Sequence, residues 1–211
     1  MFFFPLRDDN PTQRRPIISY LILAICVLVF GWQLSLGALQ HNAVVAFGMI
    51  PARLFGYAVA EQLPYQTIGW VTVFTSMFMH GGFMHLAGNM LYLWIFADNI
   101  EDSLGRVRFI IFYLLCGVGA ALAQASMDVQ SLTPMIGASG AIAGVLGGYL
   151  LLHPRANVRC VAGFFIFFRV INVPAFIVLG IWIGLQFINL GQTGSGIAYL
   201  AHIGGFAAGM V

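Results

Sequence analysis

The chain carries few charged residues and contains no lysine. Only 8% of its 211 residues are charged and 60% are hydrophobic. Soluble domains have about 25% charged residues. So few charges could not cover the surface of a soluble fold, which excludes a soluble globular protein. The composition and length together predict a polytopic membrane protein of one domain.

Cysteine is also scarce. The three cysteines, Cys26, Cys116 and Cys160, lie in or beside apolar runs, and no two of them have the short spacing of a metal site. We interpret them as free thiols that are buried or face the membrane. We therefore expect no metal and no cofactor. The net charge of +2 gives no indication of nucleic acid as a partner.

Six apolar segments have the character of membrane helices. Crossing a bilayer takes about 20 apolar residues, or fewer where the helix ends lie in protein. The predicted spans cover residues 17–36, 83–97, 109–125 and 136–152, a stretch within 172–190, and 199 to 211. The lipid bilayer is thus the expected surrounding of the chain.

The spans divide the chain into a short leading segment and one helical domain. We predict an all-α membrane protein with a cytoplasmic segment at residues 1–16 and a six-helix domain at residues 17–211. Residues 37–82 should form a long, partly structured external loop. The sixth span makes only ~20 Å of helix against a hydrocarbon core ~30 Å thick, so we expect that helix to be truncated.

The arginines predict the orientation. With six spans, Arg53 falls on one side of the membrane, and the other arginines fall on the opposite side: Arg7, Arg14, Arg15, Arg106, Arg108, Arg155, Arg159 and Arg169. The positive-inside rule makes the arginine-rich side cytoplasmic, and it places both termini there. A compact chain without a transit peptide or an extra domain indicates a prokaryotic inner or plasma membrane.

Four polar residues from three spans are predicted to lie at one depth. Ser139 lies ~21 Å of helix before the cytoplasmic end of its span, and His85 lies ~20 Å before the end of its own. Asn89 is one turn below His85 on the same face, and His202 is near the outer start of the last span. Each alone fits a packing or hydrogen-bonding role. Their agreement, roughly 10 Å below the outer surface, favours a functional site.

Glycines provide a reason for these residues to meet. Gly140, Gly144 and Gly148 form a small-residue ridge on the fourth span, and Gly205 and Gly209 form another on the sixth. Such ridges let helix backbones approach closely. Ser139 and His202 lie next to the outer ends of the two ridges. Close packing would bring the serine oxygen within ~3 Å of an imidazole nitrogen, which is the distance that activation by a base requires.

A third catalytic partner is not apparent. None of the acidic residues lies in a span at the level of Ser139: Asp8, Asp9, Glu61, Asp98, Glu101, Asp102 and Asp128. We therefore predict a Ser-His dyad and not a triad. Ser139 begins a helix, where unpaired backbone N–H groups can stabilise an oxyanion. The side chains of His85 and Asn89 could add donors.

With these motifs the chain resembles the rhomboid intramembrane serine proteases. The resemblance extends over nearly the whole chain, and three motifs carry it. They are the series His80, His85 and Asn89, the segment Gly137-Ala138-Ser139-Gly140, and the segment Ala201-His202-Ile203-Gly204-Gly205 with Gly209. In this order within a six-span protein they are highly specific.

The resemblance implies a role for each matching position. Ser139 would be the nucleophile, His202 the general base and acid, and the Ser139 backbone N–H with Asn89 and His85 the oxyanion hole. Structural support would come from His80, Gly137, Gly140, Gly144, Gly205, Gly209, Glu101 and Arg106. Substrates would be transmembrane proteins that enter laterally past the fifth span. The first outer loop would be partly embedded in the membrane.

Two positions depart from the family's pattern. Many members have Trp-Arg in the first loop, whereas here Arg53 has no adjoining tryptophan. Some members have a tyrosine one turn after the serine, beneath the histidine ring, and this chain has Ala143 there. His202 must then be oriented in another way. We also expect a polar cavity that opens outward, rimmed by the first loop, residues 192–196 and the top of the fifth span.

Two other functions are alternatives to a protease. A catalytically inactive rhomboid-like protein would bind or escort transmembrane helices, and it would lack reacting groups that are present here. A transporter or metal-handling protein could use His80, His85 and His202, but the expected partner ligands are absent and the cysteines lie elsewhere. The sequence does not indicate the physiological substrate or the oligomeric state.

Overall fold

A computed structural model describes residues 2–164, 167–192 and 196–211. Its helices are α1 (Ile17–Ser35), α2 (Gln40–Phe47), α3 (Pro51–Leu54), α4 (Gly69–Ser76), α5 (Phe83–Leu104), α6 (Arg106–Ala125), α7 (Ser139–Leu152), α8 (Ala175–Asn189) and α9 (Tyr199–Gly209). Two 3₁₀ helices, η1 (Gly37–Leu39) and η2 (Ala58–Gln62), lie in the loop between α1 and α5. The strands are β1 (Phe2–Asp8), β2 (Asn157–Phe164) and β3 (Phe167–Pro174).

Helices occupy each of the six positions at which spans were predicted. Among the described residues, α1 and α6 are long and apolar enough to cross a membrane by themselves, and α7 and α8 are shorter apolar helices. The count of six spans therefore stays a prediction. α5 continues to Leu104, past the expected end of its span at Ala97, because Asp98 and the polar residues after it are compatible with a helix. Gly105, with φ 77°, ends it.

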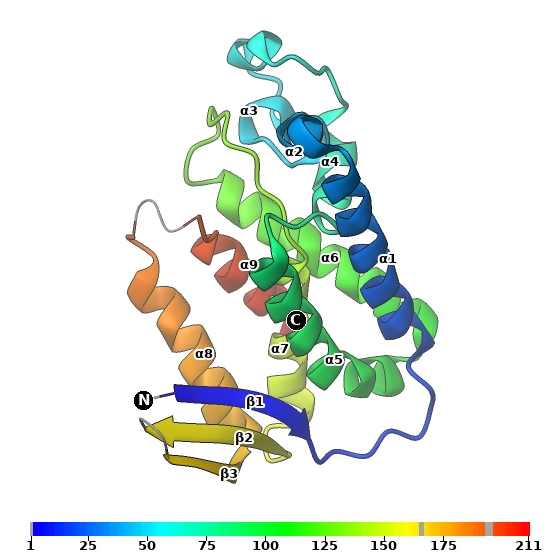
Figure 1. Cartoon of the computed structure of the whole chain (residues 1–211), viewed down its shortest axis with the longest axis vertical. Coiled ribbons are helices and arrows are strands. Elements are labelled where there is room, and N and C mark those ends of the chain that lie inside the picture. The colour runs from blue at the N-terminus through cyan, green and yellow to red at the C-terminus, as the bar shows by residue number, and fades with distance from the viewer. Residues whose placement is uncertain (1, 165–166, 193–195) are drawn as a thin grey trace.

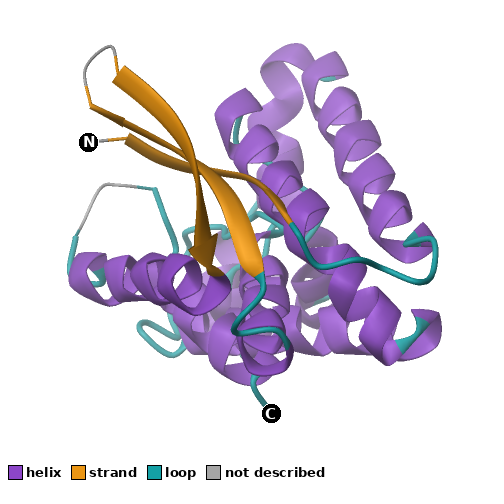
Figure 2. Cartoon of the chain, turned by 90° about the horizontal axis from the view of Figure 1, so that it is seen from below, coloured by secondary structure: helices purple, strands orange, loops and turns teal. Residues whose placement is uncertain are grey.

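The expectation of an all-α fold was wrong, because the chain also forms a three-stranded antiparallel sheet in the order β1-β2-β3. The sheet lies at the opposite end of the molecule from α2, α3 and α4, and its strands run across the direction of α8 (Figures 1 and 2). Buried Val158 and Cys160 alternate with exposed Arg159 along β2, which is the period of a strand with one covered face.

The sheet also takes in residues that were assigned to a separate leading segment. β1 pairs with β2, so Phe4 lies opposite Val161. The Asp9 carboxylate accepts hydrogen bonds from the backbone N–H and the side-chain amide of Asn157, at 2.8 and 3.0 Å. The leading residues are thus bound to β2 and to its first residue, Asn157.

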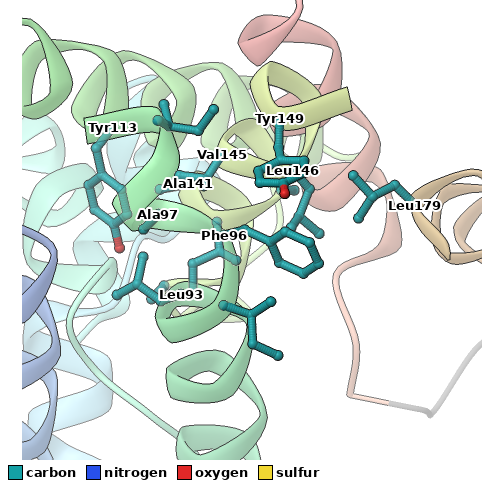
Figure 3. Close-up of a cluster of buried hydrophobic side chains, with 14 of the residues drawn as sticks. Leu93, Phe96, Ala97, Tyr113, Ala141, Val145, Leu146, Tyr149 and Leu179 are labelled. Atoms are coloured by element: carbon teal, nitrogen blue, oxygen red, sulfur yellow. The ribbon is translucent and has the colours of Figure 1, made fainter. Parts of the chain in front are cut away.

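α7 is the central helix of the bundle. Every residue from Gly140 to Tyr149 is buried, and α5, α6, α8 and α9 pack around it. Figure 3 shows part of this core, with Leu93 and Phe96 of α5, Leu146 and Tyr149 of α7, and Leu179 of α8. Because α7 is buried from Gly140 to Tyr149, its first residue, Ser139, is held in a fixed place at the start of this central helix.

Glu101 joins α5 to the start of α1. Its carboxylate accepts hydrogen bonds from the backbone N–H groups of Ile18 and Ser19, at 3.0 and 2.8 Å, and from the Ser19 hydroxyl at 2.8 Å. The residue before α1 is Pro16, which provides no side-chain cap. Glu101 therefore satisfies donors that the helix itself leaves unpaired.

Replacing Glu101 with alanine should destabilise the fold by about 2–4 kcal/mol, because it leaves three donors, two of them buried, without their acceptor. Thermal unfolding in detergent micelles measures this. Glu101→Gln, which keeps one acceptor oxygen, should lose less. Glu61→Ala, at an exposed site, is the control and should change stability by no more than about 0.5 kcal/mol. Equal stability of Glu101→Ala and the control would refute the capping role.

Candidate active site

Ser139 and His202 meet where α7 and α9 begin. Ser139 is the first residue of α7, and His202 lies in the first turn of α9. Nε2 of His202 is 2.9 Å from Oγ of Ser139. The helix that carries His202 is itself held in place, since Oε1 of Gln124 on α6 accepts the Ala201 backbone N–H at 3.1 Å. A serine hydroxyl at this distance can donate its proton to a neutral imidazole.

Glycines bring the two helices together. A Cβ atom on Gly205 would overlap the carbonyl oxygen of Gly140, and one on Gly209 would overlap the carbonyl oxygen of Gly144. The two small-residue ridges thus lie against each other, backbone to backbone. Side chains at these positions would push α9 away from α7, so the contact between Ser139 and His202 depends on the glycines.

The second ring nitrogen of His202 contacts α8. Nδ1 is 2.8 Å from Oε1 of Gln186, whose Nε2 donates to the Trp182 carbonyl oxygen at 2.9 Å. The Trp182 ring lies beside the imidazole, with 5.7 Å between the ring centroids. The sequence analysis missed both residues. The available signal was an amide side chain in an otherwise apolar helix, four residues after a tryptophan and therefore on the same face.

His85 and Asn89 lie on the first two turns of α5. Nδ1 of His85 accepts the Gly81 backbone N–H at 3.2 Å, so in the neutral ring Nε2 carries the proton and is a donor. A Cβ on Gly137 would lie 2.8 Å from that Nε2, and Gly137 has φ 132°. Only glycine suits this close approach. Nδ2 of Asn89 donates one hydrogen bond to the His85 carbonyl oxygen, at 2.8 Å, and its second N–H is available for another acceptor.

The remaining expected support residues differ in their contacts. His80 is fully buried with its ring 5.2 Å from that of His85, and its backbone exchanges two hydrogen bonds with the Gln33 side chain of α1. Arg106 is exposed at the start of α6. Arg53 organises the first loop, since its guanidinium donates to the carbonyl oxygens of Val45 and Tyr65, both at 2.9 Å.

One cavity of about 1120 Å³ contains Ser139, His202, His85 and Asn89 in its wall. Its lining also includes residues of the first loop, of α8 and of the segment before α9: Met49, Pro51, Trp182, Gln192 and Gly196. Of the predicted rim at 192–196, residues 193–195 lie outside the described residues. The polar groups thus face a space large enough to admit a peptide segment and water.

Comparison with known proteins gives the family. The model of the Rhomboid domain matches residues 68–211, which include all three motifs and most of the residues that line the cavity. The chain belongs to the rhomboid family. Rhomboid proteins are membrane proteins, and the apolar helices of this chain agree with that. The resemblance noted from the motifs is confirmed.

Several rhomboid relatives align with the chain. It is 31% identical over 198 residues to "Rhomboid protease GluP" of Bacillus subtilis, covering 92% of this chain and 34% of that protein. It is 26% identical to "Putative rhomboid protease YdcA" of the same organism, covering 93% and 86%. It is 29% identical over 152 residues to "Rhomboid protein 1, mitochondrial" of Saccharomyces cerevisiae, covering 67% and 40%. The chain spans about a third of GluP, so the activity of the whole relative does not transfer directly.

Proposed function

We propose that this rhomboid protein is a serine endopeptidase that cleaves membrane proteins within or beside a transmembrane segment. The observation that carries the proposal is the 2.9 Å contact between Oγ of Ser139 and Nε2 of His202 at the cavity wall. The histidine is placed to accept the serine proton because its Nδ1 faces an acceptor oxygen, which leaves Nε2 without a proton.

Each step of the reaction has a group in place for it. Oγ of Ser139 attacks the peptide carbonyl carbon while His202 takes its proton. The oxyanion is stabilised by the Ser139 backbone N–H at the start of α7, by Nε2–H of His85 and by the free Nδ2–H of Asn89. His202 then protonates the leaving amine, and an acyl-enzyme ester remains. Water from the cavity, deprotonated by His202, hydrolyses the ester and restores the Ser139 hydroxyl.

The family and the charge pattern support a position for the site. The excess of arginine on one side supports a cytoplasmic location of the sheet and both termini, with the cavity on the outer side of the membrane, which we take to be a prokaryotic one. α8 exposes a long apolar face, including Ile181, Leu185 and Ile188, which suits contact with lipid. Substrate helices would enter laterally past α8.

A fluorophosphonate probe tests the activation of Ser139. The purified protein in detergent should be labelled at Ser139, because the probe reacts with a serine that a base deprotonates and not with an ordinary hydroxyl. His202→Ala should remove the label, whereas Ser126→Ala, at the exposed end of α6, should leave it unchanged. Mass spectrometry of the labelled peptide identifies the site. A folded protein that takes up no label would favour a helix-binding protein without catalysis.

A further inference from the structure

The Nδ1 side of the His202 ring faces α8. Ala143 provides no hydrogen-bonding group from α7, and the Gln186 side chain is 2.8 Å from Nδ1. We propose that Gln186 is the positioning residue for His202, holding its imidazole in the reactive tautomer and orientation. The inference rests on the proposed function, since it assigns the third member of the same site.

The direction of the Gln186 amide follows from its second contact. Nε2 donates to the carbonyl oxygen of Trp182, one turn earlier on α8. The reversed amide would set its oxygen against that carbonyl oxygen, which is repulsive. Oε1 therefore faces His202 and accepts a hydrogen bond from Nδ1–H. A ring that donates from Nδ1 has its lone pair at Nε2, where Ser139 lies. Gln186 thus fixes the tautomer of His202, as the carboxylate does in a Ser-His-Asp triad, but it adds no buried charge.

The packing of α8 holds Gln186 in this place. The residues of α8 that are buried are Ala175, Val178 and Leu179 near its start and Gln186 in its outer half. Leu179, Trp182 and Gln186 have the spacing of one helix face. The Trp182 ring contacts those of His202 and Phe206 on α9 and that of Tyr92 on α5. By contrast, a side chain replacing Gly180 or Gly184 would meet open space. Gln186 is therefore a buried amide directed at α9 on a helix that otherwise exposes apolar side chains.

A purely structural role for Gln186 makes a different prediction. An interhelical hydrogen bond between α8 and α9 would contribute modestly to stability and nothing specific to the chemical step. A positioning role acts on the chemical step, because the wrong tautomer leaves Nε2 protonated and unable to accept the serine proton. Kinetic constants and thermal unfolding, measured on the same variants, separate the two.

The experiment uses the full chain in detergent with a single-span model substrate. Gln186→Leu should lower kcat about 10–100-fold with KM unchanged within twofold, and it should slow fluorophosphonate labelling by a similar factor. Gln186→Glu keeps an acceptor at the same reach, and in its protonated form it also keeps a donor for the Trp182 carbonyl oxygen, so it should recover part of kcat. Asn189→Leu is the matched control and should behave as wild type, since the Asn189 side chain is only partly buried and donates to its own helix at the Leu185 carbonyl oxygen. Gln186→Met provides a second variant without an acceptor, should Gln186→Leu fail to fold.

The outcomes are distinct. Unchanged kcat in a folded Gln186→Leu or Gln186→Met variant would overturn the positioning role while leaving the Ser139 and His202 assignment intact. A fall in kcat that Gln186→Glu does not recover would also overturn it, because an acceptor would then not be the property that matters. A wild-type protein that neither cleaves the substrate nor takes up the fluorophosphonate would instead refute the proposed function.

Discussion

Ser139→Ala should abolish cleavage of a single-span model substrate, with a loss of at least about 10³-fold in kcat. The expectation follows from the mechanism, because no acyl-enzyme forms without the serine oxygen, and the remaining groups only stabilise charge. The protein should still fold, since Ser139 Oγ is hydrogen-bonded to His202 and does not cap the helix backbone. Thermal unfolding of the variant should therefore stay close to that of wild type.

A second serine–histidine contact in the same chain provides the matched control. Oγ of Ser103, in the last turn of α5, is 3.1 Å from Nε2 of His153, the residue directly after α7. The Ser103 hydroxyl donates a hydrogen bond to the Asn99 carbonyl oxygen at 2.7 Å, so its oxygen accepts the hydrogen bond from His153. In this contact the histidine donates the hydrogen bond and the serine oxygen accepts it, so His153 is not placed to take the serine proton. Ser103→Ala should retain both cleavage and labelling, and retained cleavage in Ser139→Ala would refute the nucleophile assignment.

The meeting of Ser139 with His202 could be anticipated from the sequence for physical reasons. Polar groups within apolar helices are unfavourable unless they meet other polar groups, and helix rise converts residue spacing into depth. The glycine ridges indicated which two helices approach most closely. These rules concern single helices and their nearest contacts, so they hold without knowledge of the whole bundle.

Gln186 could not be assigned in the same way. An amide in an apolar helix fits an interhelical hydrogen bond to many partners, and its depth alone does not choose among them. The contact with His202 depends on the angle between α8 and α9, which is set by the rings of Trp182 and Phe206 and by Leu179 in the core. Packing of this kind is a property of the assembled bundle.

The sheet was missed for a different reason. The length of apolar runs indicates membrane spans, and arginines interrupt the segment between the fourth and fifth spans, so that segment resembles a connection. The order Val158, Arg159, Cys160 has the apolar–polar alternation of a strand, but it is too short to be distinctive. The pairing of β1 with β2 joins residues more than 150 positions apart in places, such as Phe4 with Val161, and no local pattern predicts it.

Gly205→Ala should remove activity by displacing α9 from α7. The added methyl would overlap the carbonyl oxygen of Gly140, a backbone atom that a side-chain rotation cannot move away. Gly140 directly follows Ser139, so the displacement acts on the nucleophile itself. Overpacking of this kind destabilises by about 1–3 kcal/mol. A misplacement of about 1 Å costs about 10²-fold in rate, so the loss of kcat should exceed what the change in stability explains.

Gly184→Ala on α8 is the control for this change. It adds the same methyl to a helix at a position with open space around it, and the greater helix propensity of alanine should stabilise the protein by up to about 1 kcal/mol. Cleavage rate, fluorophosphonate labelling and thermal unfolding are to be compared for both variants and wild type. If Gly205→Ala is labelled as fast as Gly184→Ala, the Ser139 to His202 contact does not need the close approach of the two backbones. A slow but measurable labelling with a folded protein would show that the glycines set the distance between the nucleophile and its base.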